Sequence, residues 1–130
     1  MKVYFADTNI FLRFILPENT RQKSQAEKYF IGARKKEIVI VVCQIVIFEI
    51  CFALEKYYEL PRLEVYHHLK TLVSVPYFEV EERENLLEAL DIYQLENIDL
   101  VDAFLFCQAV SRNAEILSFD KDFKKLTSSL

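Results

Sequence analysis

Two aspartates stand directly after short apolar runs near opposite ends of the chain. Asp7 follows Val3–Ala6, and Asp120 follows Glu115–Phe119. Both runs have the length and composition of short buried strands. Groups that follow parallel strands gather at the carboxyl edge of the sheet, where such sheets bind their ligands. We therefore expect both carboxylates at one edge, facing a common ligand.

Three further acids extend this group. Glu49 is the only acid between Ile38 and Leu54, in a segment predicted to be a buried helix without Lys or Arg. A buried ionised carboxylate is costly unless it is paired or bound to a cation. Asp99 and Asp102 open the helix before the last predicted strand, and their spacing of three places them on nearly one face. These positions predict that carboxylates from distant segments meet in one cleft.

Several carboxylates in one cleft repel each other, and hard cations relieve that repulsion through oxygen ligands. We therefore expect one or two Mg²⁺ or Mn²⁺ ions. Two ions about 4 Å apart would activate water and stabilise the leaving oxygen of a phosphodiester. The chain has no His and Cys set suited to zinc, because the adjacent His67 and His68 point in different directions on a helix.

Each acid also has an ordinary structural explanation. Asp7 precedes Thr8 and Asn9 at the predicted start of a helix, which is a typical N-cap arrangement. Asp99 would cap the next helix start and Asp102 would face its macrodipole. Asp120 lies in a polar segment where acids are common. A non-catalytic binding module in which the acids only cap helices is therefore an alternative.

The rest of the chain alternates between two kinds of predicted element. Apolar runs predict strands at Val3–Ala6, Ile38–Val42, Pro76–Val80 and Glu115–Phe119. Helical spacing of apolar residues predicts helices at Ile10–Leu16, Asn19–Lys36, Gln44–Tyr58, Pro61–Val73, Arg83–Leu95 and Asp99–Arg112, with Pro17 ending the first. This order predicts an α/β fold with a mostly parallel central sheet of four to five strands, flanked by helices as three α/β/α layers.

Composition sets the broad class. The chain has 130 residues, is 52% hydrophobic and contains one Gly, so we expect one helix-rich domain spanning residues 1–130. Three cysteines in apolar stretches predict reduced core thiols: Cys43, Cys51 and Cys107. The N-terminus lacks a secretory signal, and Ile38–Leu54 is short for a membrane span and carries an acid. We expect a cytoplasmic protein that does not enter a membrane.

Four segments resemble, in order, the four acidic motifs of PIN-domain ribonucleases, most closely the VapC-type toxins of bacterial and archaeal toxin–antitoxin pairs. They are Ala6–Asn9, Ile47–Ile50, Asp99–Phe104 and Ser118–Phe123. The resemblance extends from Lys2 to about Phe123. Each motif is weak alone, whereas their order and spacing together are fairly specific.

The resemblance implies particular roles. The residues that match the family's metal-binding acids are Asp7, Glu49, Asp102 and Asp120. Asp99 matches a position that is acidic in only some members. Asn9 and Ser118 match polar residues that support the metal site through short hydrogen-bonding side chains. The resemblance further implies an RNA substrate, a homodimer and inhibition by a cognate antitoxin, whose peptide we expect near Phe11, Phe14 and Tyr29.

The formal net charge of −4 at first argues against a polyanionic substrate. The four proposed ligands account for all of it, so a metal-loaded protein need not repel phosphates. We expect Arg13, Lys121 or Lys124 to contact the RNA backbone.

Other enzyme classes also place an aspartate after a first strand. A haloacid-dehalogenase-like phosphatase would use Asp7 as a covalent nucleophile, but it normally has a second Asp where this chain has Asn9. A receiver-type signalling domain also needs a neighbouring acid pair and a late lysine, and no residues of this sequence can be assigned to those positions.

Overall fold

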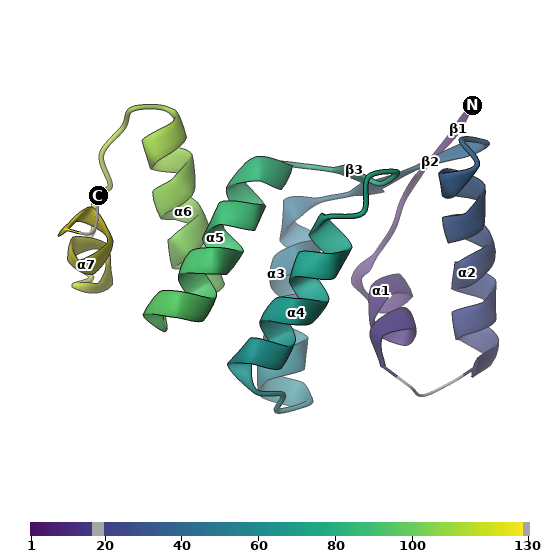
Figure 1. Cartoon of the computed structure of the whole chain (residues 1–130), viewed down its shortest axis with the longest axis horizontal. Coiled ribbons are helices and arrows are strands. Elements are labelled where there is room, and N and C mark those ends of the chain that lie inside the picture. The colour runs from purple at the N-terminus through teal and green to yellow at the C-terminus, as the bar shows by residue number, and fades with distance from the viewer. Residues whose placement is uncertain (17–19, 129–130) are drawn as a thin grey trace.

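A computed structural model of the chain describes residues 1–16 and 20–128 (Figure 1). The strands are β1 (Lys2–Phe5), β2 (Ile38–Val42) and β3 (Glu79–Val80). The helices are α1 (Thr8–Ile15), α2 (Thr20–Arg34), α3 (Gln44–Phe52), α4 (Arg62–Val73), α5 (Arg83–Glu96), α6 (Leu100–Ser111) and α7 (Asp122–Ser128), with a π-helical turn η1 (Ala53–Tyr57) continuing α3. The order predicted from β1 to α6 is confirmed. Pro17 and Asn19 lie outside the described residues.

The sheet has the order β1-β2-β3, and both pairs of strands are parallel. Tyr4 lies opposite Ile40, and Val42 lies opposite Val80. This confirms the α/β class and the parallel sheet. The described residues form three strands rather than the four to five expected.

The missing strand is the one predicted at Glu115–Phe119. This segment is irregular, and its side chains Leu117 and Phe119 are fully exposed. A strand needs a neighbour to satisfy its backbone, and the segment lies at the α7 end of the molecule, far from the edge strand β1 (Figure 1). The prediction identified a β-prone sequence but could not show whether a neighbouring strand was within reach.

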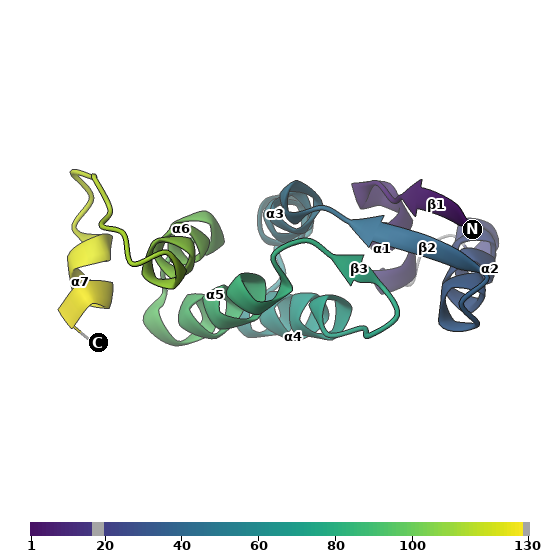
Figure 2. The same ribbon diagram turned by 90° about the horizontal axis from the view of Figure 1, so that it is seen from above.

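Helices cover one face of the sheet. Ile40 and Val42 are buried on that face, and the rings of Phe11, Phe30 and Phe78 pack together with centroids 5.3 to 6.0 Å apart. Figure 2 shows the strands with α1 and α2 behind them and no described helix in front. The described residues therefore form two layers at the sheet, namely the sheet and the helices on one of its faces, rather than the three predicted layers.

A second helical region holds the part of the chain that carries Asp99 and Asp102. α5 packs along both α4 and α6. Arg62 Nη1 on α4 donates to the carbonyl oxygens of Tyr93 at 2.7 Å and Ile98 at 2.9 Å. Its guanidinium also lies 4.0 Å from the centroid of the Tyr93 ring. These contacts fix the α5–α6 connection and thus the start of α6.

The apolar segment Ile38–Leu54 divides into β2, α3 and the start of η1. In the described part of the chain, no helix has the length and apolar character needed to cross a bilayer. Cys43, Cys51 and Cys107 are free thiols, in agreement with the prediction. Burial is the main cause that raises the pKa of Cys51 to about 12, as expected for an inert core thiol.

Candidate metal centre

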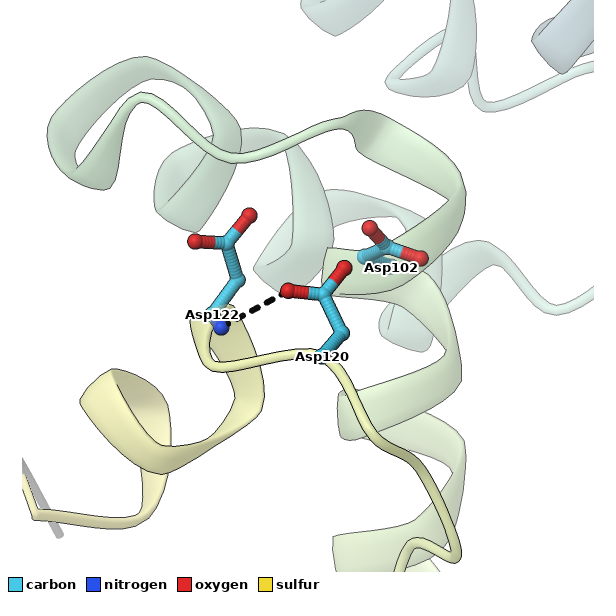
Figure 3. A group of neighbouring side chains, drawn as sticks. All are labelled: Asp102, Asp120 and Asp122. Atoms are coloured by element: carbon cyan, nitrogen blue, oxygen red, sulfur yellow. Dashed lines mark hydrogen bonds between the residues drawn. The ribbon is translucent and has the colours of Figure 1, made fainter.

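Three aspartates form a compact group that we call the acidic triad: Asp102, Asp120 and Asp122 (Figure 3). One carboxylate oxygen from each lies within 4.8 Å of the others. Asp102 comes from the first turn of α6, Asp122 is the first residue of α7, and Asp120 lies in the turn that leads into α7. The fold thus brings together two motifs that are eighteen or more residues apart.

Local hydrogen bonds position the second half of the triad. The Ser118 hydroxyl accepts the backbone N–H of Asp120 at 2.9 Å, and Asp120 Oδ1 accepts the backbone N–H of Asp122 at 2.9 Å. The second bond is drawn in Figure 3. Short side chains that bond to a backbone two residues away fix a tight turn. Ser118 therefore holds Asp120 in the position that faces Asp102.

The electrostatics of the triad disfavour its ionised form. The pKa of Asp102 is raised from its ordinary value, first by burial and then by the negative charges of Asp120, Asp99 and Asp122. The ion pair that the described residues form joins Lys70 to Asp91, and it does not involve the triad. Three carboxylates at this separation, none of them in an ion pair with a described residue, match the ligand preference of Mg²⁺ or Mn²⁺.

Asp99 lies at the N-cap position of α6, but its side chain makes no capping hydrogen bond. The capping explanation weighed for this residue is therefore not observed. Its carboxylate is exposed, and its charge contributes to raising the pKa of Asp102. Asp99 thus lies beside the triad rather than within it.

Asp7 and Glu49 form a second acidic group, with Asp7 at the start of α1 and Glu49 on α3. Asp7 caps α1, since its Oδ1 accepts the backbone N–H groups of Asn9 at 3.1 Å and Ile10 at 3.3 Å. Thr8 Oγ1 donates to Glu49 Oε2 at 3.0 Å. This bond links α3 to the residue after Asp7, so both carboxylates belong to the carboxyl edge of the sheet.

The burial argument for Glu49 was wrong. Ile45, Glu49 and Phe52 lie on one face of α3, and that face is exposed, with exposed fractions of 63% for Ile45 and 65% for Phe52. The apolar sequence of α3 suggested burial on all sides, whereas the helix buries only the side that carries Ile47 and Ile50. Glu49 is solvated and therefore needs no cation to offset burial.

The five acids named from the sequence thus lie in two groups. Asp102 and Asp120 join the triad with Asp99 beside it, whereas Asp7 and Glu49 lie at α1 and α3. The groups flank a common surface, because Val101, which precedes Asp102, lines the same open cavity of about 600 Å³ as Thr8 and Glu49. They do not converge on a single cluster in the described structure.

Two residues near these groups were not among the predicted ligands. Asp122 completes the triad, and its place two residues after Asp120 in a tight turn was the available signal. Thr8 holds Glu49, and its place beside Asp7 was visible in the same motif. Side-chain hydrogen bonds between distant segments leave no spacing pattern in a sequence, which is why Thr8 was not singled out.

Basic side chains accompany each acidic group. Arg13 and Lys28 line a cavity of about 550 Å³ together with Asp7 and Asn9. Lys124 lines another cavity with Ser118 and Asp120, and that cavity has a volume of about 360 Å³. Cations near the rim of an acidic centre favour a substrate that carries phosphates.

Comparison with known proteins agrees with this architecture. Residues 4–128 match the family model described as the PIN domain. The chain is also 27% identical over 121 residues to the VapC ribonuclease of Aquifex aeolicus (strain VF5), an alignment that covers 92% of this chain and 89% of that protein. A family match over almost the whole length, together with the ordered acidic motifs, assigns the chain to the PIN domain family.

Proposed function

We propose that this protein is a divalent-metal-dependent endoribonuclease that hydrolyses RNA phosphodiester bonds and acts as the toxin of a toxin–antitoxin pair. The observation that carries the proposal is the acidic triad, whose carboxylates approach each other without forming an ion pair in the part of the chain that the structure describes. PIN family membership and the similarity to a VapC ribonuclease supply the reaction class. The proposed ligands are the triad with Asp7, Glu49 and Asp99.

Mg²⁺ or Mn²⁺, as one or two ions, would supply Lewis acidity for the phosphoryl oxygens and a more acidic water molecule. The protein's own residues hold the carboxylates in place. Ser118 orients Asp120, and Thr8 orients Glu49, each through one hydrogen bond. The Asp7 carboxylate keeps its second oxygen available because both capping bonds fall on Oδ1. Water is the nucleophile, so no covalent intermediate with the protein is formed.

We propose that the RNA backbone runs between the two acidic groups. Arg13 lies in the cavity of Asp7, and Lys124 lies in the cavity of Asp120. Lys121 is exposed and directly follows Asp120. Neutralising a lysine or arginine that contacts a phosphate lowers the salt slope of binding by about one. An unchanged slope in the Arg13→Gln and Lys124→Gln variants would remove these contacts.

We further propose that the antitoxin inserts apolar side chains into the cavity of about 390 Å³ between α1, α2 and α4. Phe14 and Tyr77 line it and are 40% and 37% exposed, so both are accessible. Phe11, named from the sequence, also lines it but is 1% exposed and belongs to the core. Tyr29, also named, lines the cavity of Asp7 instead. Phe14→Ser should weaken antitoxin binding at least tenfold without loss of helicity.

The central test compares cleavage of assorted RNAs by the wild type and Asp7→Asn, with Mn²⁺ and with excess chelator. Asparagine caps helices as well as aspartate does, so this variant keeps the two N-cap bonds and loses the charge. We expect a folded protein without ribonuclease activity. Cleavage at the wild-type rate in the variant or in chelator would contradict the mechanism. Release of phosphate from monoesters alone would instead favour a phosphatase with Asp7 as nucleophile.

A further inference from the structure

The N-terminal end of α6 lacks the usual side-chain cap. Asp99 occupies the N-cap position, yet its side chain makes no capping hydrogen bond. A capping aspartate would use a carboxylate oxygen to accept a backbone N–H of the first turn. Because Asp99 does not, its carboxylate stays exposed and adds its charge to the surroundings of Asp102. The direction of the first turn of α6, which carries Asp102, must therefore be set by other contacts.

Arg62, the first residue of α4, supplies such contacts. Its Nη1 donates to the carbonyl oxygen of Tyr93 at 2.7 Å and to that of Ile98 at 2.9 Å. The Ile98 carbonyl lies in the same rigid peptide plane as the backbone N–H of Asp99. A single nitrogen thus joins the last turn of α5 to the peptide from which α6 begins.

The ring of Tyr93 holds the Arg62 guanidinium in this position. The central carbon of the guanidinium lies 4.0 Å from the ring centroid, and the tyrosine is completely buried. The Tyr93 hydroxyl donates to Glu55 Oε2 on η1 at 2.6 Å. The ring is therefore fixed at its face and at its hydroxyl, and a partly desolvated cation is attracted more strongly to such a ring.

This group of contacts connects the helices that carry the two acidic groups. η1 continues α3, which carries Glu49, and α5 packs between α4 and α6 (Figures 1 and 2). α3 also touches α6 directly, because the rings of Phe48 and Phe104 meet edge to face with centroids 5.1 Å apart. Phe48 precedes Glu49, and Phe104 lies two residues after Asp102. The orientation of α6 relative to α3 therefore decides how Asp102 faces Glu49.

We propose that Arg62 is a positioning residue of the candidate metal centre, which it serves by holding the Ile98 carbonyl and thereby the first turn of α6. The metal-binding part of this inference rests on the proposed function. Arg62 forms no ion pair with a described residue, since the pair found there joins Lys70 to Asp91. It acts through the backbone and not by contact with a ligand carboxylate. Residues that orient metal ligands typically contribute about 10- to 100-fold to metal affinity.

Arg83 offers a matched control. It is the first residue of α5, is half-buried like Arg62, and also donates to backbone carbonyl oxygens, those of Val73, Val75 and Phe78. These carbonyls belong to the connection between α4 and β3, which carries none of the proposed metal ligands. Arg83→Met therefore separates a general loss of stability from a loss of position at α6.

Hydrogen exchange on the metal-free chain tests the first step without any assay of activity. The amide of Ala103 donates to the Asp99 carbonyl oxygen at 3.0 Å and is the first hydrogen-bonded amide of α6. We expect the amides of residues 103–106 to exchange several-fold faster in Arg62→Met than in the wild type, and at the wild-type rate in Arg83→Met. Unchanged exchange in Arg62→Met, or equal acceleration in both variants, would overturn the proposal.

Titration with Mn²⁺ tests the second step. The dissociation constant should rise about tenfold in Arg62→Met and less than about twofold in Arg83→Met, although the thermal midpoint falls in both. Equal metal affinities in the two variants would mean that Arg62 serves stability alone. Arg62→Lys keeps the charge and a donor but lacks the planar face that lies on Tyr93, so its affinity should fall between those of the wild type and Arg62→Met. If Arg62→Met does not fold, Arg62→Lys against Arg83→Lys gives the same comparison.

Cleavage kinetics separate positioning from contact with the substrate. At saturating Mn²⁺, Arg62→Lys should regain most of the wild-type kcat with an unchanged KM for RNA. A raised KM with an unchanged kcat would mean that Arg62 contacts the RNA, and the proposal would fall. A wild type that binds no Mn²⁺ and cleaves no RNA would instead disprove the nuclease. Selective exchange at residues 103–106 in Arg62→Met would even then retain Arg62 as the residue that positions the first turn of α6.

Discussion

Two acidic regions of this molecule are built in opposite ways. On α5, Asp91 accepts hydrogen bonds from Lys70 on α4 at 2.7 Å and from the Tyr66 hydroxyl at 2.8 Å. At the junction of α6 and α7, the acidic triad brings together carboxylates that form no ion pair with any described basic side chain. The first region joins two helices, whereas the second leaves its charge uncompensated.

The pKa values of Asp91 and Asp102 are shifted in opposite directions, in agreement with this difference. Partial burial opposes ionisation of Asp91, but hydrogen bonds from Lys70 and Tyr66 outweigh it and hold its pKa below the ordinary value. Burial and three neighbouring carboxylates raise the pKa of Asp102. The chain therefore pairs its structural acid internally. The uncompensated acids are the ones suited to an external cation.

The largest expected difference between the regions is in catalysis. Asp120→Asn should lower RNA cleavage on the order of 10³-fold, because a metal ligand contributes several kcal/mol to the transition state. Asp91→Asn is the matched control, with the same chemical change on a structural acid, and should cleave at the wild-type rate. Initial rates on one RNA in Mn²⁺ measure both. Equal cleavage rates in the two variants would contradict the assignment of a catalytic role to the triad and a structural role to Asp91.

The next effect is stabilisation by metal. Mn²⁺ at about 100 times its dissociation constant should stabilise the wild type by about 2.7 kcal/mol, because it binds only the folded state. Asp91→Asn should show the same increase in thermal midpoint, and Asp102→Asn should show little or none. Thermal unfolding with and without Mn²⁺ measures this. An equal increase in thermal midpoint in all three proteins would mean that Mn²⁺ binds at a site that does not include Asp102.

Much of the fold could be predicted because the strands and helices have clear local patterns. The run Ile38–Val42 became β2 with the same bounds, and the helix opened by Pro61 became α4. The segment 115–119 has the composition of a strand, yet pairing depends on a neighbour that composition does not reveal. α7 was not predicted, since Asp122–Ser128 carries few apolar residues.

The site was predictable to a similar degree. Asp102 and Asp120 were expected to meet because both belong to the carboxyl side of an α/β fold, and they do lie together. The same reasoning placed Asp7 and Glu49 with them, which requires the last strand to lie beside β1. Because that strand is not formed, the two acidic groups stay apart. Sequence patterns predict at which edge of the sheet a residue lies. They do not show whether the neighbouring strand that would bring the residues together is formed.

A smaller effect is expected from Asp102 in the metal-free protein. Its folded pKa is raised above the ordinary value of 3.8, so the folded state binds more protons than the unfolded state in that window. The stability of the wild type should therefore fall as pH rises from 3.8 through the raised pKa. Asp102→Asn removes this dependence and should stabilise the metal-free protein at pH 7 by about 0.5 kcal/mol, because solvent screens charges that are only partly buried. Urea unfolding in chelator measures it, and a destabilised variant would disagree.

The smallest effect concerns the paired acid. Asp91→Asn should cost about 0.5 kcal/mol at pH 7, because Lys70 and Asp91 are 33% and 49% exposed and their attraction is screened. The lowered pKa of Asp91 means that this contribution is present above pH 3.8 and is lost as pH falls through the folded value. The raised pKa of Lys70 means that it is complete below pH 10.5 and lost at higher pH. The variant should therefore match the wild type at both extremes in urea unfolding and fall below it between them. A pH-independent difference in unfolding free energy would mean that Asp91 stabilises the α4–α5 contact through packing. The contrast between this region and the acidic triad would then lie in their packing and not in how their charges are compensated.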